Sequence, residues 1–393
     1  MKLYTSKTES AATEKRIVAD GMMLTKNLPT EAGSRMLAGY QSLLDAEALT
    51  RLYGAGYTLV GKADVGEFAI DLLGESSYNG APVRNGQIVC AAAQIVANGD
   101  AEAALMLDVN GSVRRAAAQS GLVSLKPTYG TVSRYGTVPV ACSGECVSVM
   151  AKNADECREV FGVMAGHDDK DGTSLPEEEI KRALLPLAVR RVAVIKEFTD
   201  GIDADSKSKL DGATKALKAA GTEVVEVSAP VIAKARAAWN ILMCAELCNN
   251  VSRYDGVKYG YRAESFSGID ELYTNSRTEA FGKLLKSAIL FGSDTLSTEN
   301  YMKVYDKALR MRRVIVEEFA KLFSEFDAVL MPASSKMAYT EEDVAKDEYI
   351  AFKENLYTAP ASITGLPAVV SGGVQLVGKA FSDATLLSLA KLL

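Results

Sequence analysis

The chain has 393 residues, of which 48% are hydrophobic and 24% charged, so it can bury a large core as one large α/β domain or two ordinary ones. A formal net charge of −6 without any basic block argues against direct nucleic-acid binding, because phosphate neutralisation supplies most non-specific affinity. The polar start MKLYTSKTESAATEKR lacks the apolar core of a secretory signal, and no later apolar run reaches the roughly 18 residues of a membrane span. We therefore expect a globular, cytoplasmic protein that binds neither nucleic acid nor membrane directly.

The hydrophobic pattern alternates between strands and helices along the chain, which is typical of an α/β protein. Residues 1–20 are polar, and we expect them to be loosely held. Residues 21–393 contain no fixed-period repeat and no linker-like run, so we expect a single domain there. The pattern predicts strands at 21–26, 57–60, 103–107, 191–195, 222–227 and 327–332. It predicts helices at 42–55, 88–98, 113–119, 153–165, 206–220, 231–251, 299–326 and 383–392.

The chain is organised around segment 107–130, LDVNGSVRRAAAQSGLVSLKPTYG. An apolar strand is followed at once by a helix, so residues 108–112 are predicted to form a tight strand-to-helix turn with Gly111 at its bend. Ser112 would then lie at a helix N-terminus, where free backbone N–H groups and the helix dipole favour negative charge on a substrate oxygen. The alternative is that Ser112 is only an N-cap, because serine is a preferred capping residue.

If Ser112 is a nucleophile, its base must be an unusual one. The single histidine, His167, lies in the polar loop GHDDKDGTS, where a serine–histidine–acid triad is not expected. Lys62 follows a predicted strand at its carboxyl end, where α/β sheets bind ligands, although most such lysines are simply solvated. Two pairs of cysteines have i, i+4 spacing: Cys142 with Cys146 and Cys244 with Cys248. This is not a zinc-knuckle spacing and buried thiols are common, so we expect no metal.

Four segments, GSVRRAAAQSGLVSLKPTYGTVSRYGTVPVA, AGHDDKDGTS, SRYDGVKYGYR and GLPAVV, resemble the amidase signature family, and especially its tRNA-dependent amidotransferase A subunits. The likeness runs from about Asp20 to Lys391. It implies an α/β amidase signature fold with a mixed central sheet covered by helices on both faces. It also implies a small glutamine-like amide as substrate, no cofactor, and B- and C-type amidotransferase subunits as possible partners.

The family uses a Ser–cis-Ser–Lys triad, which explains amide hydrolysis without histidine. The resemblance assigns the base to Lys62 in GKADVGEFA and the nucleophile to Ser112 in DVNGSVR. The bridging serine lies 24 residues before the nucleophile in the family, and this position falls on Ile88, which has no hydroxyl to carry a proton. The oxyanion hole would consist of the backbone N–H groups of Val109, Asn110 and Gly111.

Other positions of the chain agree only in part with the family pattern. Tyr261 and Arg312 match residues that bind the amino-acid end of glutamine in the family, whereas Asn355 stands where the family has an aspartate that holds the ammonium group. The second glycine of the nucleophile turn is Asn110, and the family pattern S-L-D-Q-x-G-P becomes SGECVSV at 143–149. The chain also lacks most of an N-terminal helical region, so we lean towards loss of the partner interface.

We therefore expect an impaired glutaminase that supplies ammonia for tRNA-dependent amidation. The alternatives are an amidase for another small amide and a catalytically inactive scaffold subunit. For Lys62 we expect partial desolvation near Ser112 and a lowered pKa; the alternative is a structural lysine bound to backbone carbonyls.

Overall fold

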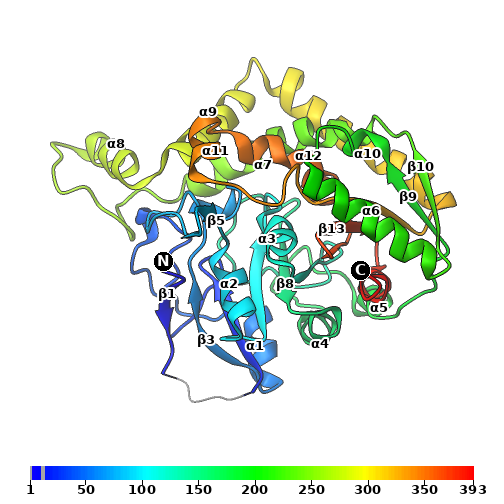
Figure 1. Cartoon of the computed structure of the whole chain (residues 1–393). Helices are drawn as coiled ribbons and strands as arrows, with labels where there is room; N and C mark the ends of the chain where they lie inside the picture. Colours follow the sequence, from blue (N-terminus) through cyan, green and yellow to red (C-terminus); the bar gives the residue numbers. More distant parts are fainter. Residues whose placement is uncertain (1, 10–13) are drawn as a thin grey trace.

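The computed structural model describes residues 2–9 and 14–393. Within these residues an 11-stranded mixed sheet forms the centre of the molecule, in the order β1-β3-β2-β6-β8-β7-β12-β13-β11-β9-β10 (Figure 1). The strands are β1 Tyr4–Lys7, β2 Arg16–Asp20, β3 Thr58–Ala63, β6 Ala103–Asp108, β7 Val123–Lys126, β8 Cys146–Ala151, β9 Arg191–Ile195, β10 Glu223–Val227, β11 Ala328–Pro332, β12 Ala368–Ser371 and β13 Val374–Gly378. A separate pair joins β4 (Val83–Arg84) to β5 (Gln87–Ile88). The predicted mixed central sheet is confirmed.

Helices cover both faces of this sheet. The α-helices of the described residues are α1 Glu47–Gly54, α2 Ala91–Asn98, α3 Ser112–Ser120, α4 Ala154–Met164, α5 Glu177–Ala183, α6 Ala204–Ala219, α7 Ala235–Val251, α8 Ile269–Ala280, α9 Lys283–Thr295, α10 Asp306–Glu325, α11 Glu341–Lys346, α12 Ile350–Thr364 and α13 Asp383–Ala390. Helices α2 and α3 pack on one face of the strands around β6, and α1 and α4 on the other. Helices α7 and α9 to α12 lie together along the top of Figure 1. No helix in the described part of the chain is both long and apolar enough to cross a membrane.

The N-terminal segment differs from its prediction where the structure describes it. Residues 4–7 form β1 and residues 16–20 form β2, which pairs with β3 on one side and β6 on the other. The expected boundary at residue 20 therefore lies at the end of an interior strand of the sheet, and the predicted strand at 21–26 begins five residues too late. Only three apolar residues of β2, between Arg16 and Asp20, are fully buried. Such a short apolar run among polar neighbours gives too weak a hydrophobic signal to predict a strand.

Most other predicted elements are present with shifted ends. The strand–helix–strand unit β9–α6–β10 has parallel strands, as predicted. Asn153 caps α4 by accepting a hydrogen bond from the Glu156 N–H at 2.9 Å. The helix predicted at 88–98 begins at Ala91, because residues 87–88 pair as β5 instead. The helix predicted at 299–326 begins with a π-helical turn at Tyr301–Tyr305, which leads into α10.

Candidate active site

The turn between β6 and α3 has the predicted strand-to-helix form. Strand β6 ends at Asp108 and α3 begins at Ser112, whose side chain is only 6% exposed. Gly111 has φ 80°, a left-handed conformation that favours glycine. A Cβ atom on Gly111 would lie 2.3 Å from Cβ of Thr358, so no larger residue fits against α12. We call residues 108–112 the nucleophile turn.

A buried ion pair anchors the nucleophile turn to α3. Asp108 accepts hydrogen bonds from Nε and Nη2 of Arg114 at 2.9 and 3.0 Å, and both side chains are fully buried. Burial raises the pKa of Asp108, but the attraction of the Arg114 guanidinium outweighs it and holds this pKa below its usual range. Arg114 also donates to the Thr358 carbonyl oxygen, Gln375 Oε1 and Ser362 Oγ. The turn is therefore bonded to α12 and β13 as well as to its own helix.

The predicted oxyanion hole is partly available. The Gly111 N–H donates to Asp108 Oδ1 at 3.1 Å, so it already has an acceptor. Among the described residues, the backbone N–H groups of Val109 and Asn110 have no hydrogen-bond partner. Two free N–H groups beside the start of α3 can stabilise a developing oxyanion.

Lys62 projects from the face of the sheet opposite to α3. In the sheet it pairs with Ala19, which pairs in turn with Leu105. Paired residues project from the same face, and Ala19 and Leu105 belong to the apolar cluster beneath α1 and α4, whereas α3 packs on the opposite face. The Lys62 amine donates to the Met23 carbonyl oxygen, and no hydrogen bond in the described residues joins Lys62 to Ser112.

The pKa of Lys62 is lowered, as expected from the sequence. Burial lowers the pKa of Lys62 to about 8, although the carboxylates of Asp20, Asp45 and Glu31 oppose the shift. Burial also raises the pKa of Asp20 to about 6, against hydrogen bonds from the backbone N–H groups of Leu107 and Met22 and the attraction of Lys62. The expected lowering of the lysine pKa is thus present, but the contacts of the amine are those of the structural alternative.

Ile88, at the bridging-serine position, is a core residue. Its N–H donates to the Tyr339 carbonyl oxygen and its carbonyl oxygen accepts from Gln119 Nε2, both at 2.7 Å. Its side chain is fully buried in the apolar cluster beneath α2 and α3. No peptide bond in the described residues is cis. This position therefore supplies neither a hydroxyl nor a free loop.

The three predicted substrate-binding residues lie in different surroundings. Arg312 on α10 donates from Nη2 to the Ser143 carbonyl oxygen at 3.1 Å. Tyr261 donates from its hydroxyl to Glu279 on α8. Asn355 on α12 is fully buried, and its amide hydrogen-bonds to the side chain of Asn110 in the nucleophile turn. Among the three, hydrogen bonds of the described residues connect only Asn355 to that turn.

The amide contacts continue beyond Asn355. Its amide also hydrogen-bonds to Asn240 Oδ1 on α7 at 2.7 Å. We call the series Asn110–Asn355–Asn240 the amide chain. Asn240 lines a hollow of about 350 Å³ between α7, α9 and α12. Asn110 and Asn355 are both site positions predicted from the sequence, but Asn240 lies in a helix pattern without a recognisable motif, so the sequence gives no signal for the connection between them.

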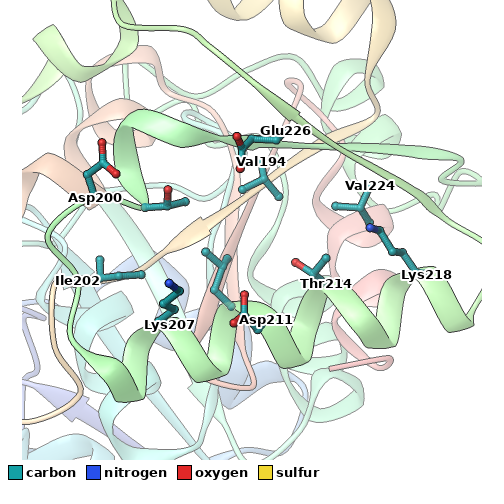
Figure 2. Close-up of a pocket in the computed structure, with 11 residues that line it drawn as sticks. Val194, Asp200, Ile202, Lys207, Asp211, Thr214, Lys218, Val224 and Glu226 are labelled. Carbon is teal, nitrogen blue, oxygen red and sulfur yellow. The ribbon is translucent and has the colours of Figure 1, made fainter.

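A second hollow, of about 390 Å³, lies at the β10 end of the sheet, where it contains none of the predicted site residues. Figure 2 shows its charged side chains of both signs on α6, on β10 and on the loop after β9. They are Lys207, Asp211 and Lys218 on α6, Glu226 on β10 and Asp200 in the loop.

His167 and the cysteines lie outside the nucleophile turn. His167 is exposed; its Nδ1 lies 2.9 Å from the Leu175 carbonyl oxygen and its Nε2 lies 3.0 Å from Asp169. All six cysteines are free. The described residues contain no group of three or more histidine, cysteine, aspartate or glutamate side chains that could hold a metal ion.

Comparisons with known proteins give the family of the chain. The Amidase family matches residues 22–387. The A subunit of the glutamyl-tRNA(Gln) amidotransferase from Symbiobacterium thermophilum is 36% identical over 93% of this chain and 79% of its own length. The corresponding A subunit from Halorhodospira halophila is 35% identical over 95% of this chain and 81% of its own length. The crystal structure of the glutamyl-tRNA(Gln) amidotransferase A subunit from Thermotoga maritima has a TM-score of 0.79 and 27% identity, covering 99% of this chain and 86% of that one. Together with the strand-to-helix turn that presents Ser112, these matches show that the chain belongs to the amidase signature family and is similar to its amidotransferase A subunits.

Proposed function

We propose that the protein is an amidase of the amidotransferase A-subunit type whose hydrolysis of side-chain amides is strongly impaired. The observation that carries this proposal is the contrast at Ser112: the nucleophile turn is complete, but no base is hydrogen-bonded to its hydroxyl in the described residues. The curated relatives are named as A subunits of a glutamyl-tRNA(Gln) amidotransferase, which supports a role in tRNA-dependent amidation, and we propose that this chain supplies the ammonia by hydrolysing glutamine. Such a role requires partner subunits, since each of these relatives is itself named as one subunit of an amidotransferase.

The proposed reaction is acyl transfer to Ser112. Its Oγ attacks the amide carbonyl carbon, the carbonyl oxygen becomes an oxyanion beside the N–H groups of Val109 and Asn110, and the C–N bond breaks to release ammonia. Water then hydrolyses the acyl ester on Ser112. The hydroxyl proton passes through solvent to the departing amide nitrogen, because no side chain of the described residues is hydrogen-bonded to Ser112. Loss of one positioned base typically costs on the order of 10² to 10⁴ in rate.

Glutamine is the proposed substrate, with Arg312 as the group that attracts its carboxylate. Among the described residues Arg312 makes one hydrogen bond, to the Ser143 carbonyl oxygen, which leaves further N–H donors for a ligand. Asn355, which stands in place of an aspartate, offers no charge to the ammonium group of glutamine. Weak binding of glutamine is therefore part of the proposal.

A continuous ammonia-release assay with glutamine, asparagine and simple amides tests this function. We expect slow turnover that Ser112→Ala abolishes. Ser120→Ala, at the other end of α3, is the matched control and should retain the activity. Turnover that survives Ser112→Ala would exclude this serine as the nucleophile, and turnover at the rate of an intact glutaminase would contradict the impairment.

The second candidate function is a non-catalytic subunit that binds partners. It is favoured by Lys62 and Ile88, which both hold structural positions in place of catalytic ones. This candidate predicts no ammonia release from any amide, with or without B- and C-type subunits. Ile88→Ser alone should not restore activity, because the backbone of residue 88 stays bonded to Tyr339 and Gln119. Co-expression with such subunits, followed by size-exclusion chromatography, would show whether a complex forms.

A further inference from the structure

We propose that the hollow between α7, α9 and α12 is a binding pocket for an uncharged aromatic amide. Its volume of about 350 Å³ lies within the range of roughly 300 to 1,000 Å³ found for small-molecule sites. The rings of Phe291, Tyr349 and Phe352 form much of its wall. Tyr349 and Phe352 are stacked, with ring centroids 6.4 Å apart and planes inclined by 18°. A flat ring can pack against walls of this kind.

The polar group of the pocket, the Asn240 amide, is oriented by a backbone carbonyl. Asn240 Nδ2 donates to the Phe352 carbonyl oxygen at 3.0 Å, and Asn240 Oδ1 lies 2.7 Å from the Asn355 amide. Asn240 Nδ2 still has a second N–H group to donate, and Oδ1 has a second lone pair to accept a hydrogen bond. A carboxamide on the ligand can satisfy both at once. Because Asn240 is already oriented, little conformational entropy is lost when the ligand binds.

The pocket offers no counter-charge to an ionised ligand. None of the described residues that line it is charged. The adjoining hollow shares Ser287 and Tyr349 with it and contains three charged side chains. Lys283 and Glu348 are paired with each other at 2.5 Å, and the Glu75 carboxylate accepts hydrogen bonds from the backbone N–H groups of residues 72–74. A carboxylate or ammonium buried beside the rings would therefore have no free partner, which is costly. The chemistry of the lining selects a neutral ligand.

Isothermal titration with benzamide and with benzoate at pH 7.5 tests this assignment. The Ser112→Ala variant is used throughout, so turnover cannot contribute and failure of the pocket is separate from failure of the proposed function. We expect saturable binding of benzamide and at least tenfold weaker binding of benzoate. Absence of saturable benzamide binding, or equal affinity for the two probes, would overturn the proposal.

Two neighbouring side chains on α9 provide the matched variants. Phe291 is 45% exposed and lines the pocket, whereas Leu290 is 71% exposed and does not. We expect Phe291→Ala to weaken benzamide binding at least fivefold and Leu290→Ala to leave it unchanged. Equal loss in both variants would indicate a general apolar patch instead of this pocket. Both side chains are partly in solvent, so neither change should prevent folding, and the melting temperature checks this.

Discussion

The nucleophile turn and the segment around Ile88 and Lys62 are both buried, yet they differ in what their polar groups do. In the turn, the Gly111 N–H donates to Asp108, and Asp108 is paired with Arg114 in α3. In the second region, the Lys62 amine is bonded to a backbone carbonyl and Ile88 is part of the apolar core. The nucleophile turn is thus held by contacts that involve neither Lys62 nor Ile88, so its shape can persist for structural reasons alone.

The nucleophile turn also contributes to the stability of the fold. Through Arg114 it is bonded to residues of α12 and β13, which lie far along the chain. Substitutions there should therefore affect folding even if the protein has no activity. Substitutions of Lys62 should affect stability in a pH-dependent way, because its charge is buried.

The largest expected effect is that of Arg114→Met. It leaves Asp108 fully buried without its partner, which should lower the free energy of unfolding by about 3–5 kcal/mol. Denaturant unfolding followed by circular dichroism measures the change. Arg313→Met is the matched control, because Arg313 also forms an ion pair, with Glu317 at 2.7 Å, but is 78% exposed. The control should change stability by less than about 1 kcal/mol. An equal loss of unfolding free energy in the two variants would show that the Asp108–Arg114 pair stabilises the protein no more than an exposed ion pair on a helix surface.

The next effect is the pH dependence contributed by Lys62. Its pKa is about 8 in the folded protein against an ordinary lysine value of 10.5, so the unfolded chain binds more protons between these values. Stability should therefore rise with pH across this window, by up to roughly 3 kcal/mol. Lys62→Met should lack this component, seen as a difference between the two unfolding curves from pH 7 to 10.5. Lys321→Met, at a 75% exposed lysine, is the control and should leave the pH dependence unchanged. Parallel curves for wild type and Lys62→Met would show that the amine is not buried.

The smallest effect compares the glycines at the two ends of α3. Both have positive φ, 80° at Gly111 and 67° at Gly121, so alanine is strained at either position. Only at Gly111 would the new Cβ meet another residue, Thr358, whereas at Gly121 nothing lies within 4 Å. Gly111→Ala should therefore cost about 1–3 kcal/mol more than Gly121→Ala in thermal or denaturant unfolding. An equal cost would mean that α12 is not packed against the nucleophile turn.

Much of the fold could be predicted from the sequence because it depends on local patterns. The strand-to-helix turn at Ser112 follows from an apolar run, a glycine and a helical pattern within a few residues. The parallel β9–α6–β10 unit follows from the same kind of periodicity. Strand β2 was placed too late, because three buried apolar residues give a weak signal among polar neighbours. The family resemblance rested likewise on continuous motifs, and the comparisons bear it out.

The local pattern is enough to predict about half of the strands and helices, the turn that presents Ser112 and the family. Only the tertiary structure decided which side chains meet. The pairing of β2 with β3 shifts register at Ile17, and a shift of one residue moves every later side chain to the other face, so the strand pattern could not show which way Lys62 projects. The amide chain joins residues 245 positions apart, and Arg114 reaches a carbonyl 244 positions away. Such contacts depend on the packing of α12 against α3 and α7, which no local pattern encodes.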